Sequence, residues 1–225
     1  MRYPGGKGKC YQRLINLMPP HHTYIESHLG GGAVMRQKKA ATRSIGLDVD
    51  PQVIDLWRGE HPDVCELHEV DAVTFLQAFN FQGDELLYVD PPYLPDTRHR
   101  KKVYRFDYSL EDHKRLLKLL VTIPCKVMIS GYDSKLYNTT LPGWHKVSFQ
   151  AKTHVDVRDE CVWMNFEPQG RLHDSRFMGN TFRDRQTIQR RQARLRSRID
   201  RMEPAERHAL LQWMQENYGC TEEVA

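Results

Sequence analysis

Residues 85–93 read ELLYVDPPY, a compact apolar strand that runs directly into an acid, two prolines and a tyrosine. The two prolines fix the backbone and remove two N–H donors, which leaves carbonyl groups to face outward. In an open α/β sheet, ligands bind beyond the carboxyl ends of the strands, where this tetrapeptide lies. A rigid surface turn is the plainer interpretation, but loops at strand ends often carry function. We therefore expect a ligand site at residues 90–93.

The tetrapeptide suits a planar ring that bears an amino group. An amide-like NH2 group can donate to the Asp90 carboxylate and to the backbone carbonyl of Pro91, while the ring stacks on Tyr93. The candidate catalytic residues are accordingly Asp90, Pro91, Pro92 and Tyr93.

Strand and helix patterns alternate on both sides of this stretch. Strands are predicted at 23–26, 44–48, 64–70, 85–89 and 126–130, and helices at 7–18, 34–41, from Pro51 onward and at 110–121. Segments 145–150 and 161–167 are expected to form a terminal hairpin. Alternating strands and helices indicate an α/β fold, with a largely parallel sheet covered by helices on both faces.

A second candidate site lies at residues 26–33, which read ESHLGGGA. A glycine-rich turn between a strand and a helix lets a ligand approach the backbone closely. The turn is not a dinucleotide-binding fingerprint, because the third glycine is missing after Gly32, and alone it indicates only a tight connection. However, Asp48 ends the next strand, where an acid typically accepts hydrogen bonds from ribose hydroxyls. Together these features predict an adenosine-containing cofactor.

The composition changes sharply after residues 168–170. We expect a catalytic domain at 1–168 and a basic helical extension at 169–225, with helices at 181–202 and 205–218. Ten arginines and three aspartates between Arg171 and Arg201 give this stretch a net charge of +7, whereas the whole chain carries +4. Concentrated guanidinium groups indicate a polyanionic partner, because they bind phosphate through paired hydrogen bonds. A solvated, arginine-rich helix is the alternative.

Several classes of protein are disfavoured. No apolar run approaches the roughly 18 to 20 residues that cross a bilayer, and the start MRYPGGKGK lacks the apolar stretch of a secretory signal. We therefore expect a cytoplasmic protein with no membrane partner. The five cysteines form no CxxC pair and the eleven histidines no HExxH motif, so no metal site is expected.

Taken in chain order, these blocks resemble the Dam-type family of DNA adenine-N6 methyltransferases. That family opens with an aromatic residue followed by x-GGK, continues with an E-P-F-x-G-x-G-like loop and an acidic strand end, and then shows DPPY. The matching segments here are 3–7, 26–32, 47–50 and 90–93, with weaker similarity at 109–120, 127–130 and 159–162. The resemblance covers roughly residues 1–168.

The resemblance implies a Rossmann-like, S-adenosylmethionine-dependent methyltransferase fold: a mostly parallel seven-stranded sheet with a terminal antiparallel hairpin, here followed by C-terminal helices. It implies that Tyr3 and Lys7 hold the methionine end of S-adenosylmethionine and that Asp48 binds the ribose. Asp71 would meet the adenine amino group of the cofactor, although an acid before a helix is more often an N-cap. The residues expected to bind the cofactor are Tyr3, Lys7, Glu26, Leu29, Gly30, Gly31, Gly32, Asp48, Val49, Asp71 and Asp90.

The resemblance also implies a DNA partner, duplex or single-stranded, whose target adenine leaves the base stack. About 57 residues separate Gly32 from Asp90, the interval where sequence-specific members commonly insert a target-recognition domain. The cofactor-binding elements fill that interval, so we expect recognition of few bases, through the 93–108 loop, the 154–158 hairpin and the basic tail. The residues expected to contact DNA are Arg98, Arg100, Lys101, Lys102, Arg105, Arg158, Arg183, Arg190, Arg191 and Arg194. The sequence leaves open whether the protein is a monomer or a homodimer.

The chain departs from the family pattern at Ser27 and His28, where a proline and a phenylalanine are usual. Two alternatives are a methyltransferase that acts on RNA adenine and one that acts on a protein glutamine, since both also present an NH2 group to a D/N-P-P-Y loop. The changes at Ser27 and His28 support a third alternative, a non-catalytic nucleic-acid-binding relative. The acid at position 90 and the N-terminal Gly-Gly-Lys block favour the DNA family over the first two.

Overall fold

The computed structural model describes residues 6–8, 10–97, 104–152, 157–168 and 170–219, with the backbone alone at 151–152 and 157–158. The chain divides into two compact units, Met1–Phe177 and Met178–Ala225. Among the described residues, every helix is too short or too polar to cross a membrane.

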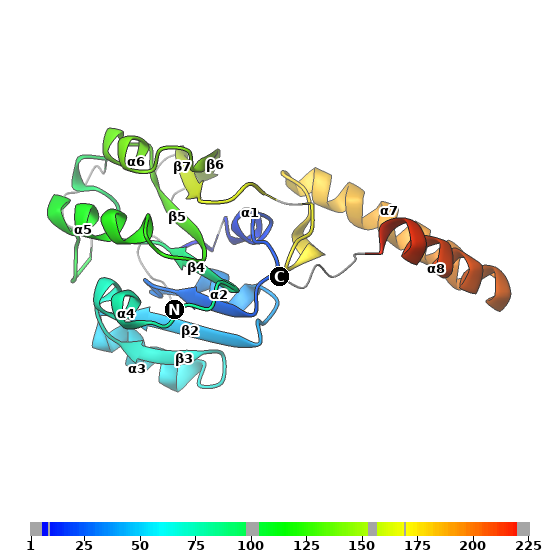
Figure 1. Cartoon of the computed structure of the whole chain (residues 1–225), viewed down its shortest axis with the longest axis horizontal. Coiled ribbons are helices and arrows are strands. Elements are labelled where there is room, and N and C mark those ends of the chain that lie inside the picture. The colour runs from blue at the N-terminus through cyan, green and yellow to red at the C-terminus, as the bar shows by residue number, and fades with distance from the viewer. Residues whose placement is uncertain (1–5, 9, 98–103, 153–156, 169, 220–225) are drawn as a thin grey trace. The chain divides into compact units, whose positions relative to one another are not determined.

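The first unit alternates strands with helices, as the sequence predicts (Figure 1). Its strands are β1 Thr23–Glu26, β2 Arg43–Asp48, β3 Glu66–Glu69, β4 Glu85–Val89, β5 Lys126–Tyr132, β6 His145–Lys152 and β7 Val157–Met164. Its helices are α1 Tyr11–Ile15, α2 Ala33–Gln37, α3 Pro51–Glu60, α4 Ala72–Ala78, α5 Leu110–Leu120 and α6 Lys135–Thr140, with 3-10 turns at Pro95–Thr97 and Ser175–Phe177.

All seven strands form one sheet in the order β3-β2-β1-β4-β5-β7-β6. The first five strands in this order pair in parallel, whereas β7 pairs antiparallel with both β5 and β6. The strand order reverses between β1 and β4, and such a switch point opens a crevice at the carboxyl ends of the strands. The predicted fold, a mostly parallel seven-stranded sheet with a terminal antiparallel hairpin and C-terminal helices, is confirmed.

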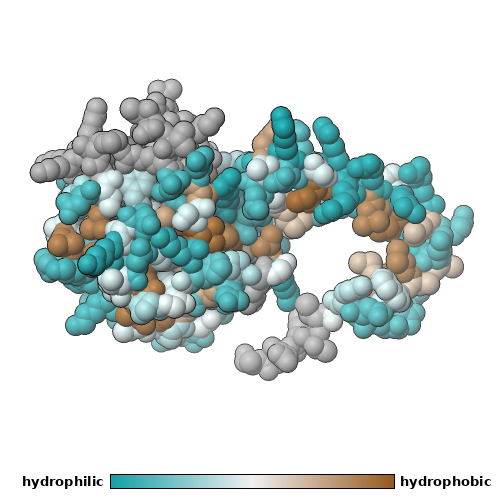
Figure 2. Space-filling view, turned by 90° about the horizontal axis from the view of Figure 1, so that it is seen from above, coloured by the Kyte–Doolittle hydropathy of each residue, from teal (hydrophilic) through white to brown (hydrophobic). Residues whose placement is uncertain are grey.

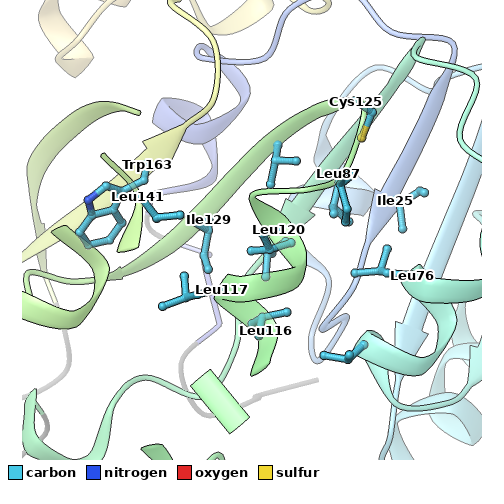
Figure 3. Close-up of a cluster of buried hydrophobic side chains, with 14 of the residues drawn as sticks. Ile25, Leu76, Leu87, Leu116, Leu117, Leu120, Cys125, Ile129, Leu141 and Trp163 are labelled. Atoms are coloured by element: carbon cyan, nitrogen blue, oxygen red, sulfur yellow. The ribbon is translucent and has the colours of Figure 1, made fainter. Parts of the chain in front are cut away.

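Each face of the sheet carries its own hydrophobic core, because successive strand residues point to opposite faces. On one face, Ile25 and Leu87 pack among side chains that include Leu76 of α4, Leu117 of α5 and Leu141, the residue after α6 (Figure 3). On the other face, the neighbouring strand residues lie against α1, α2 and α3, and the core there includes Leu14, Tyr24, Val34, Trp57 and Leu86. Parallel strands buried on both faces explain the nearly continuous apolar run of β4.

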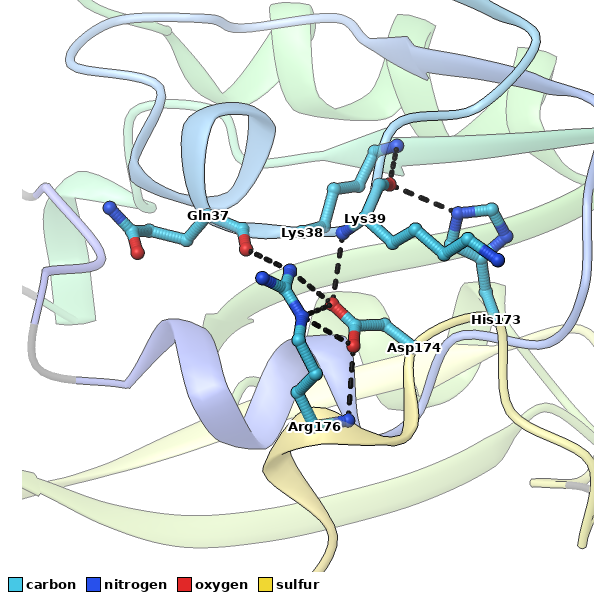
Figure 4. Close-up of polar contacts among 6 residues, drawn as sticks. All are labelled: Gln37, Lys38, Lys39, His173, Asp174 and Arg176. Carbon is cyan, nitrogen blue, oxygen red and sulfur yellow. Dashed lines mark hydrogen bonds and ion pairs between the residues drawn. The ribbon is translucent and has the colours of Figure 1, made fainter.

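The last residues of the first unit are hydrogen-bonded to segments that precede β1 and β2. Asp174 accepts hydrogen bonds from the backbone N–H of Lys39 and from the Arg176 guanidinium, which also donates to Gln37 O (Figure 4). His173 donates its backbone N–H to Met18 O. These bonds attach the 173–176 segment to the rest of the first unit, and the two compact units divide after Phe177.

The second unit consists of α7 Phe182–Asp200 and α8 Pro204–Tyr218. Thr181 and Asp184 form a capping box that begins α7, and Pro204 occupies the first turn of α8. No residue of either helix is buried, and hydrophobic side chains lie among hydrophilic ones on their surface (Figure 2). The large hydrophobic side chains exposed on these two helices are Phe182, Leu195, Leu211, Trp213, Met214 and Tyr218.

Candidate active site

The turn after β1 requires glycine at two positions. Both have a backbone conformation that favours glycine, and the second also lies against a large neighbouring side chain. Gly30 and Gly32 have positive φ angles of 46° and 51°, a region that L-residues with side chains rarely adopt. A Cβ atom on Gly32 would lie 2.0 Å from Cζ2 of Trp57. The Trp57 indole N–H donates to Gly30 O at 2.9 Å, so α3 holds the turn in place.

Asp48 fastens the same turn to the end of β2. Its Oδ2 accepts the Gly30 N–H at 2.8 Å and its Oδ1 accepts the Asp50 N–H at 2.9 Å. Burial raises the pKa of Asp48 above its usual range despite these backbone bonds. Each carboxylate oxygen keeps a second lone pair, so Asp48 can bridge the turn and a hydroxyl group of a ligand.

Asp90, at the end of β4, forms an ion pair with Lys7. The Lys7 Nζ lies 2.5 Å and 2.7 Å from the two carboxylate oxygens of Asp90. Burial raises the pKa of Asp90, and the Lys7 charge opposes that shift without cancelling it. Burial alone would lower the pKa of Lys7, but the charges of Asp90 and Glu160 outweigh burial and raise it. Lys7 therefore stays charged and contacts the catalytic candidate directly.

Tyr93 completes this cluster. Its hydroxyl donates to Glu160 Oε1, and the Lys7 Nζ lies 4.9 Å from the centre of its ring. The ring also packs edge-on against Tyr132, with 4.7 Å between ring centres. Tyr93 is thus held on three sides, while its side chain remains half-buried.

A segment that follows the undescribed residues 98–103 lies over the glycine turn and the end of β2. Tyr108 OH and His28 Nε2 are 2.8 Å apart, and the His28 Nδ1 is 2.9 Å from the Ser27 hydroxyl. Arg105 forms an ion pair with Asp50, which also caps α3 through the Gln52 N–H. These two contacts attach the 104–108 segment to the glycine turn at His28 and to the start of α3 at Asp50.

Two titratable groups in this region are held neutral. Burial raises the pKa of Glu26 to about 8, and its carboxyl accepts a hydrogen bond from the Tyr24 hydroxyl at 3.0 Å. Burial also lowers the pKa of His28 to about 3. A neutral imidazole donates from one nitrogen and accepts at the other, which matches its two hydroxyl partners, Ser27 and Tyr108.

Asp71 acts as the N-cap of α4, the alternative that its position suggests. Its Oδ1 accepts from the Thr74 N–H and hydroxyl at 2.9 Å and 2.8 Å. Arg115 donates to the same oxygen at 2.8 Å. The cap and the ion pair thus share Oδ1, and Asp71 still lines the cavity described next.

One cavity joins these parts and contains about 810 Å³ of space, some of it open to solvent. Its lining includes most of the residues predicted to bind the cofactor, namely Lys7, Glu26, Leu29, Gly30, Gly31, Gly32, Asp48, Val49, Asp71 and Asp90. Pro92 and the 104–106 residues also line it. Asp90 and the glycine turn therefore line the same cavity.

The residues expected to contact DNA do not form one group in the structure, and several of them cannot be placed. Arg98, Arg100, Lys101 and Lys102 lie outside the described residues, as do Tyr3 and the side chain of Arg158. Arg105 is engaged with Asp50 and remains half exposed. Four predicted contacts are exposed on α7: Arg183, Arg190, Arg191 and Arg194.

Sequence reasoning missed the roles of four residues of the site. Glu160 lies within the weakly similar 159–162 stretch, but nothing in the sequence showed that the hairpin brings it to Asp90. Asp50 follows Asp48 by two positions, and its role as helix cap was signalled only by Pro51. Trp57 had no local signal, because it acts through a contact with a distant segment. Tyr108 lies in the 93–108 loop and was a candidate either to fill the space left by a flipped base or to anchor the core, but its contact with His28 was not predicted.

No known protein family and no curated protein sequence matches the chain. Among solved structures, the chain is similar to the N-methyltransferase NodS from Bradyrhizobium japonicum, with 11% identity over 71% of this chain and 94% of that one and a TM-score of 0.49. An O-methyltransferase from Bacillus cereus in complex with SAH shows 10% identity over 73% and 82%, with a TM-score of 0.49. A putative RNA methyltransferase from Pyrococcus horikoshii shows 13% identity over 72% and 85%, with a TM-score of 0.48.

Proposed function

We propose that this protein is an S-adenosylmethionine-dependent methyltransferase that methylates the N6 amino group of adenine in DNA. The observation that carries the proposal is the shared cavity, which Asp90 at the end of β4 lines together with the glycine turn and Asp48. The sequence resemblance to Dam-type enzymes, with Asp90-Pro91-Pro92-Tyr93 and Gly5-Gly6-Lys7, supports DNA adenine as the substrate.

The residues of the cavity fit the proposed cofactor. Gly32 leaves backbone without a side chain beside the cavity, where a Cβ atom would meet Trp57. Asp48 presents a buried carboxylate at the position where such folds bind ribose hydroxyls. When bound, S-adenosylmethionine supplies an electrophilic methyl group. The glycine turn and Asp48 would hold it, with the 104–108 segment covering them.

The catalytic role falls to the tetrapeptide after β4. The target adenine must leave the base stack, at a cost of a few kcal/mol, because its amino group is otherwise paired. Tyr93 would stack on the extruded base, a contact worth about 1–3 kcal/mol. Asp90 and the Pro91 carbonyl would accept hydrogen bonds from the two amino protons. The nitrogen would bond to the methyl group as the bond between that group and the cofactor's sulfur breaks, and it would then release one proton to solvent. Until that release, the Asp90 carboxylate would stabilise the positive charge that develops on the nitrogen.

Phosphate contacts would come mainly from the basic residues of α7. The exposed arginines of α7 have the charge and the fork geometry that bind a phosphate backbone. Arg105 can contribute only if it leaves Asp50 or shares its guanidinium with a phosphate.

Transfer of a radioactive methyl group to duplex DNA, single-stranded DNA, RNA and a glutamine-bearing protein, side by side, tests the proposal. We expect label in DNA with the wild-type protein and none with Asp90→Ala. If the label appears only in RNA or only in the protein, that polymer is the substrate and DNA is not. Binding of DNA without label in any polymer would identify a non-catalytic relative.

A further inference from the structure

The Lys7 cluster contains one ammonium group and two carboxylates. Lys7 Nζ lies 2.5 Å from Asp90 Oδ1 and 3.4 Å from Glu160 Oε1. The side chains of Lys7 and Glu160 are 8% and 7% exposed, so solvent screens this cluster weakly. A single lysine is therefore within reach of two acids.

The proposed chemistry conflicts with the arrangement of this cluster. Lys7 contacts both carboxylate oxygens of Asp90, the same atoms that must accept a hydrogen bond from the substrate amine. Removing a buried ammonium from its carboxylate is costly unless another acid replaces it. Glu160 is that acid, because its Oε1 already faces the same Nζ.

The antiparallel hairpin explains why Glu160 is at this position. Glu160 lies on β7, where it pairs in register with Tyr132 on β5. Tyr132 packs against Tyr93, and the Tyr93 hydroxyl donates a hydrogen bond to Glu160. The hairpin thereby adds an acid to a site otherwise built from β1, β2 and β4.

We propose that Glu160 is a positioning residue that takes over Lys7 when the substrate amine binds Asp90, and that it holds the Tyr93 ring in place. This inference rests on the proposed function, because it assumes that Asp90 accepts the amine. Lys7 keeps its proton throughout, and only its carboxylate partner changes. Nothing in the resemblance to Dam-type enzymes assigns a role to position 160.

Glu160→Gln separates the two parts of this role. The glutamine amide still offers an oxygen to the Tyr93 hydroxyl but lacks the charge that would hold Lys7. We expect kcat for DNA methylation to fall roughly 10- to 100-fold with cofactor affinity unchanged. The acid limb of the pH profile should move to lower pH, because the Glu160 charge helps to raise the pKa of Asp90. Asp159→Asn, an exposed acid one position earlier on β7, is the matched control and should change neither.

A double-mutant cycle of Lys7 and Glu160 tests whether Lys7 moves from Asp90 to Glu160. In a Lys7→Met background there is no ammonium to transfer, so adding Glu160→Gln should lower kcat by no more than about twofold. An equal loss in both backgrounds would overturn the exchange, as would a wild-type rate and pH profile in Glu160→Gln.

A measurement without catalysis keeps the inference separate from the proposed function. The pKa of Lys7 can be followed by nuclear magnetic resonance in protein with carbon-13-labelled lysine. Asp90→Asn mimics an Asp90 occupied by substrate, and Glu160 should then keep the pKa of Lys7 above its usual range. In Asp90→Asn with Glu160→Gln, both carboxylates are gone and the pKa should fall by about 2 units or more. If Glu160→Gln changes the Lys7 pKa in neither background, Glu160 does not hold the lysine. If the wild-type protein methylates nothing but this pattern appears, only the proposed function fails.

Discussion

The indole ring of Trp57 fills the space that a side chain on Gly32 would occupy. A Cβ atom there would lie 2.0 Å and 2.7 Å from two ring carbons, and the φ angle of +51° adds backbone strain. The bulk of α3 therefore sets the shape of the glycine turn, and the turn forms one wall of the cavity.

Gly32→Ala should accordingly abolish cofactor binding. The methyl group would displace Trp57 or the turn, with an overpacking cost of about 1–3 kcal/mol. Isothermal calorimetry with S-adenosylmethionine measures the binding and urea unfolding measures the stability. Gly59→Ala is the control on α3, since a Cβ there meets nothing within 4 Å. It should stabilise the helix by about 0.5–1 kcal/mol and leave cofactor affinity unchanged.

Asp90→Asn should lower kcat by about 100-fold or more while cofactor affinity stays within a few-fold. The amide keeps the shape of the side chain but removes the charge that stabilises the developing positive nitrogen. Steady-state kinetics on DNA, with calorimetry on the same protein, separate the two quantities. Near-normal turnover in this variant would contradict the assigned role of Asp90.

The stability of the apoprotein should depend on Glu26 at mildly acidic to neutral pH. Its folded-state pKa of about 8 exceeds the ordinary value of 4.5, so the folded state binds the proton more tightly than the unfolded state. The contribution of Glu26 is therefore full below about pH 4.5 and is lost as pH rises towards 8. Urea unfolding at several pH values gives the free energy of unfolding of wild type and of Glu26→Gln. The difference between the two proteins reports Glu26 alone, because the contribution of the histidines is common to both and cancels. An identical pH dependence in the two proteins would show that folding does not raise the pKa of Glu26.

The 104–108 segment should control the rate at which the cofactor leaves. Tyr108→Phe removes the hydroxyl that bonds to His28, and a hydrogen bond worth about 0.5–1.5 kcal/mol corresponds to a roughly 2- to 12-fold change in rate. Stopped-flow measurement of cofactor dissociation tests this. Arg58→Ala removes an exposed ion pair on α3 and serves as the control. Equal dissociation rates in wild type and Tyr108→Phe would show that this bond does not restrain the cofactor.

DNA affinity should fall steeply with salt, and the arginines of α7 should account for part of that slope. Replacing Arg190, Arg191 and Arg194 with alanine should reduce the slope of log K against log salt by about 0.9 for each phosphate of duplex DNA that these arginines neutralise. Fluorescence anisotropy at several salt concentrations measures the slope. Arg207→Ala, also exposed but on α8, is the control. An unchanged slope in the triple variant would show that these arginines are solvated and do not contact DNA phosphates.

The fold was predictable where the sequence has strong local patterns. Strands β1 and β4 begin and end where their apolar residues predict, and Pro51 begins α3 as expected. Helix α6 was not anticipated, because KLYNTT carries no helical spacing of apolar residues, and Ser134 as N-cap is its main local signal. Strand β7 begins at Val157 rather than at 161, since its charged first residues pair with β6 without an apolar pattern.

The site was predictable only as separate pieces. The Asp90 tetrapeptide, the glycine turn and Asp48 were each recognised, because each stands at a strand end where ligands bind. Their connections were not, since Lys7 and Asp90 are 83 positions apart and Tyr93 and Glu160 are 67 apart. Such contacts depend on strand order and on hairpin register, which a single sequence does not contain.

The chemical identity of the product tests the central claim most directly. Duplex DNA incubated with the purified protein and S-adenosylmethionine can be digested to nucleosides and analysed by mass spectrometry. If Asp90 and the Pro91 carbonyl bind an adenine amino group, N6-methyldeoxyadenosine will accumulate with wild type and will be absent with Asp90→Ala. Methylation of another base, or methylation that survives the loss of Asp90, would contradict this account of the site.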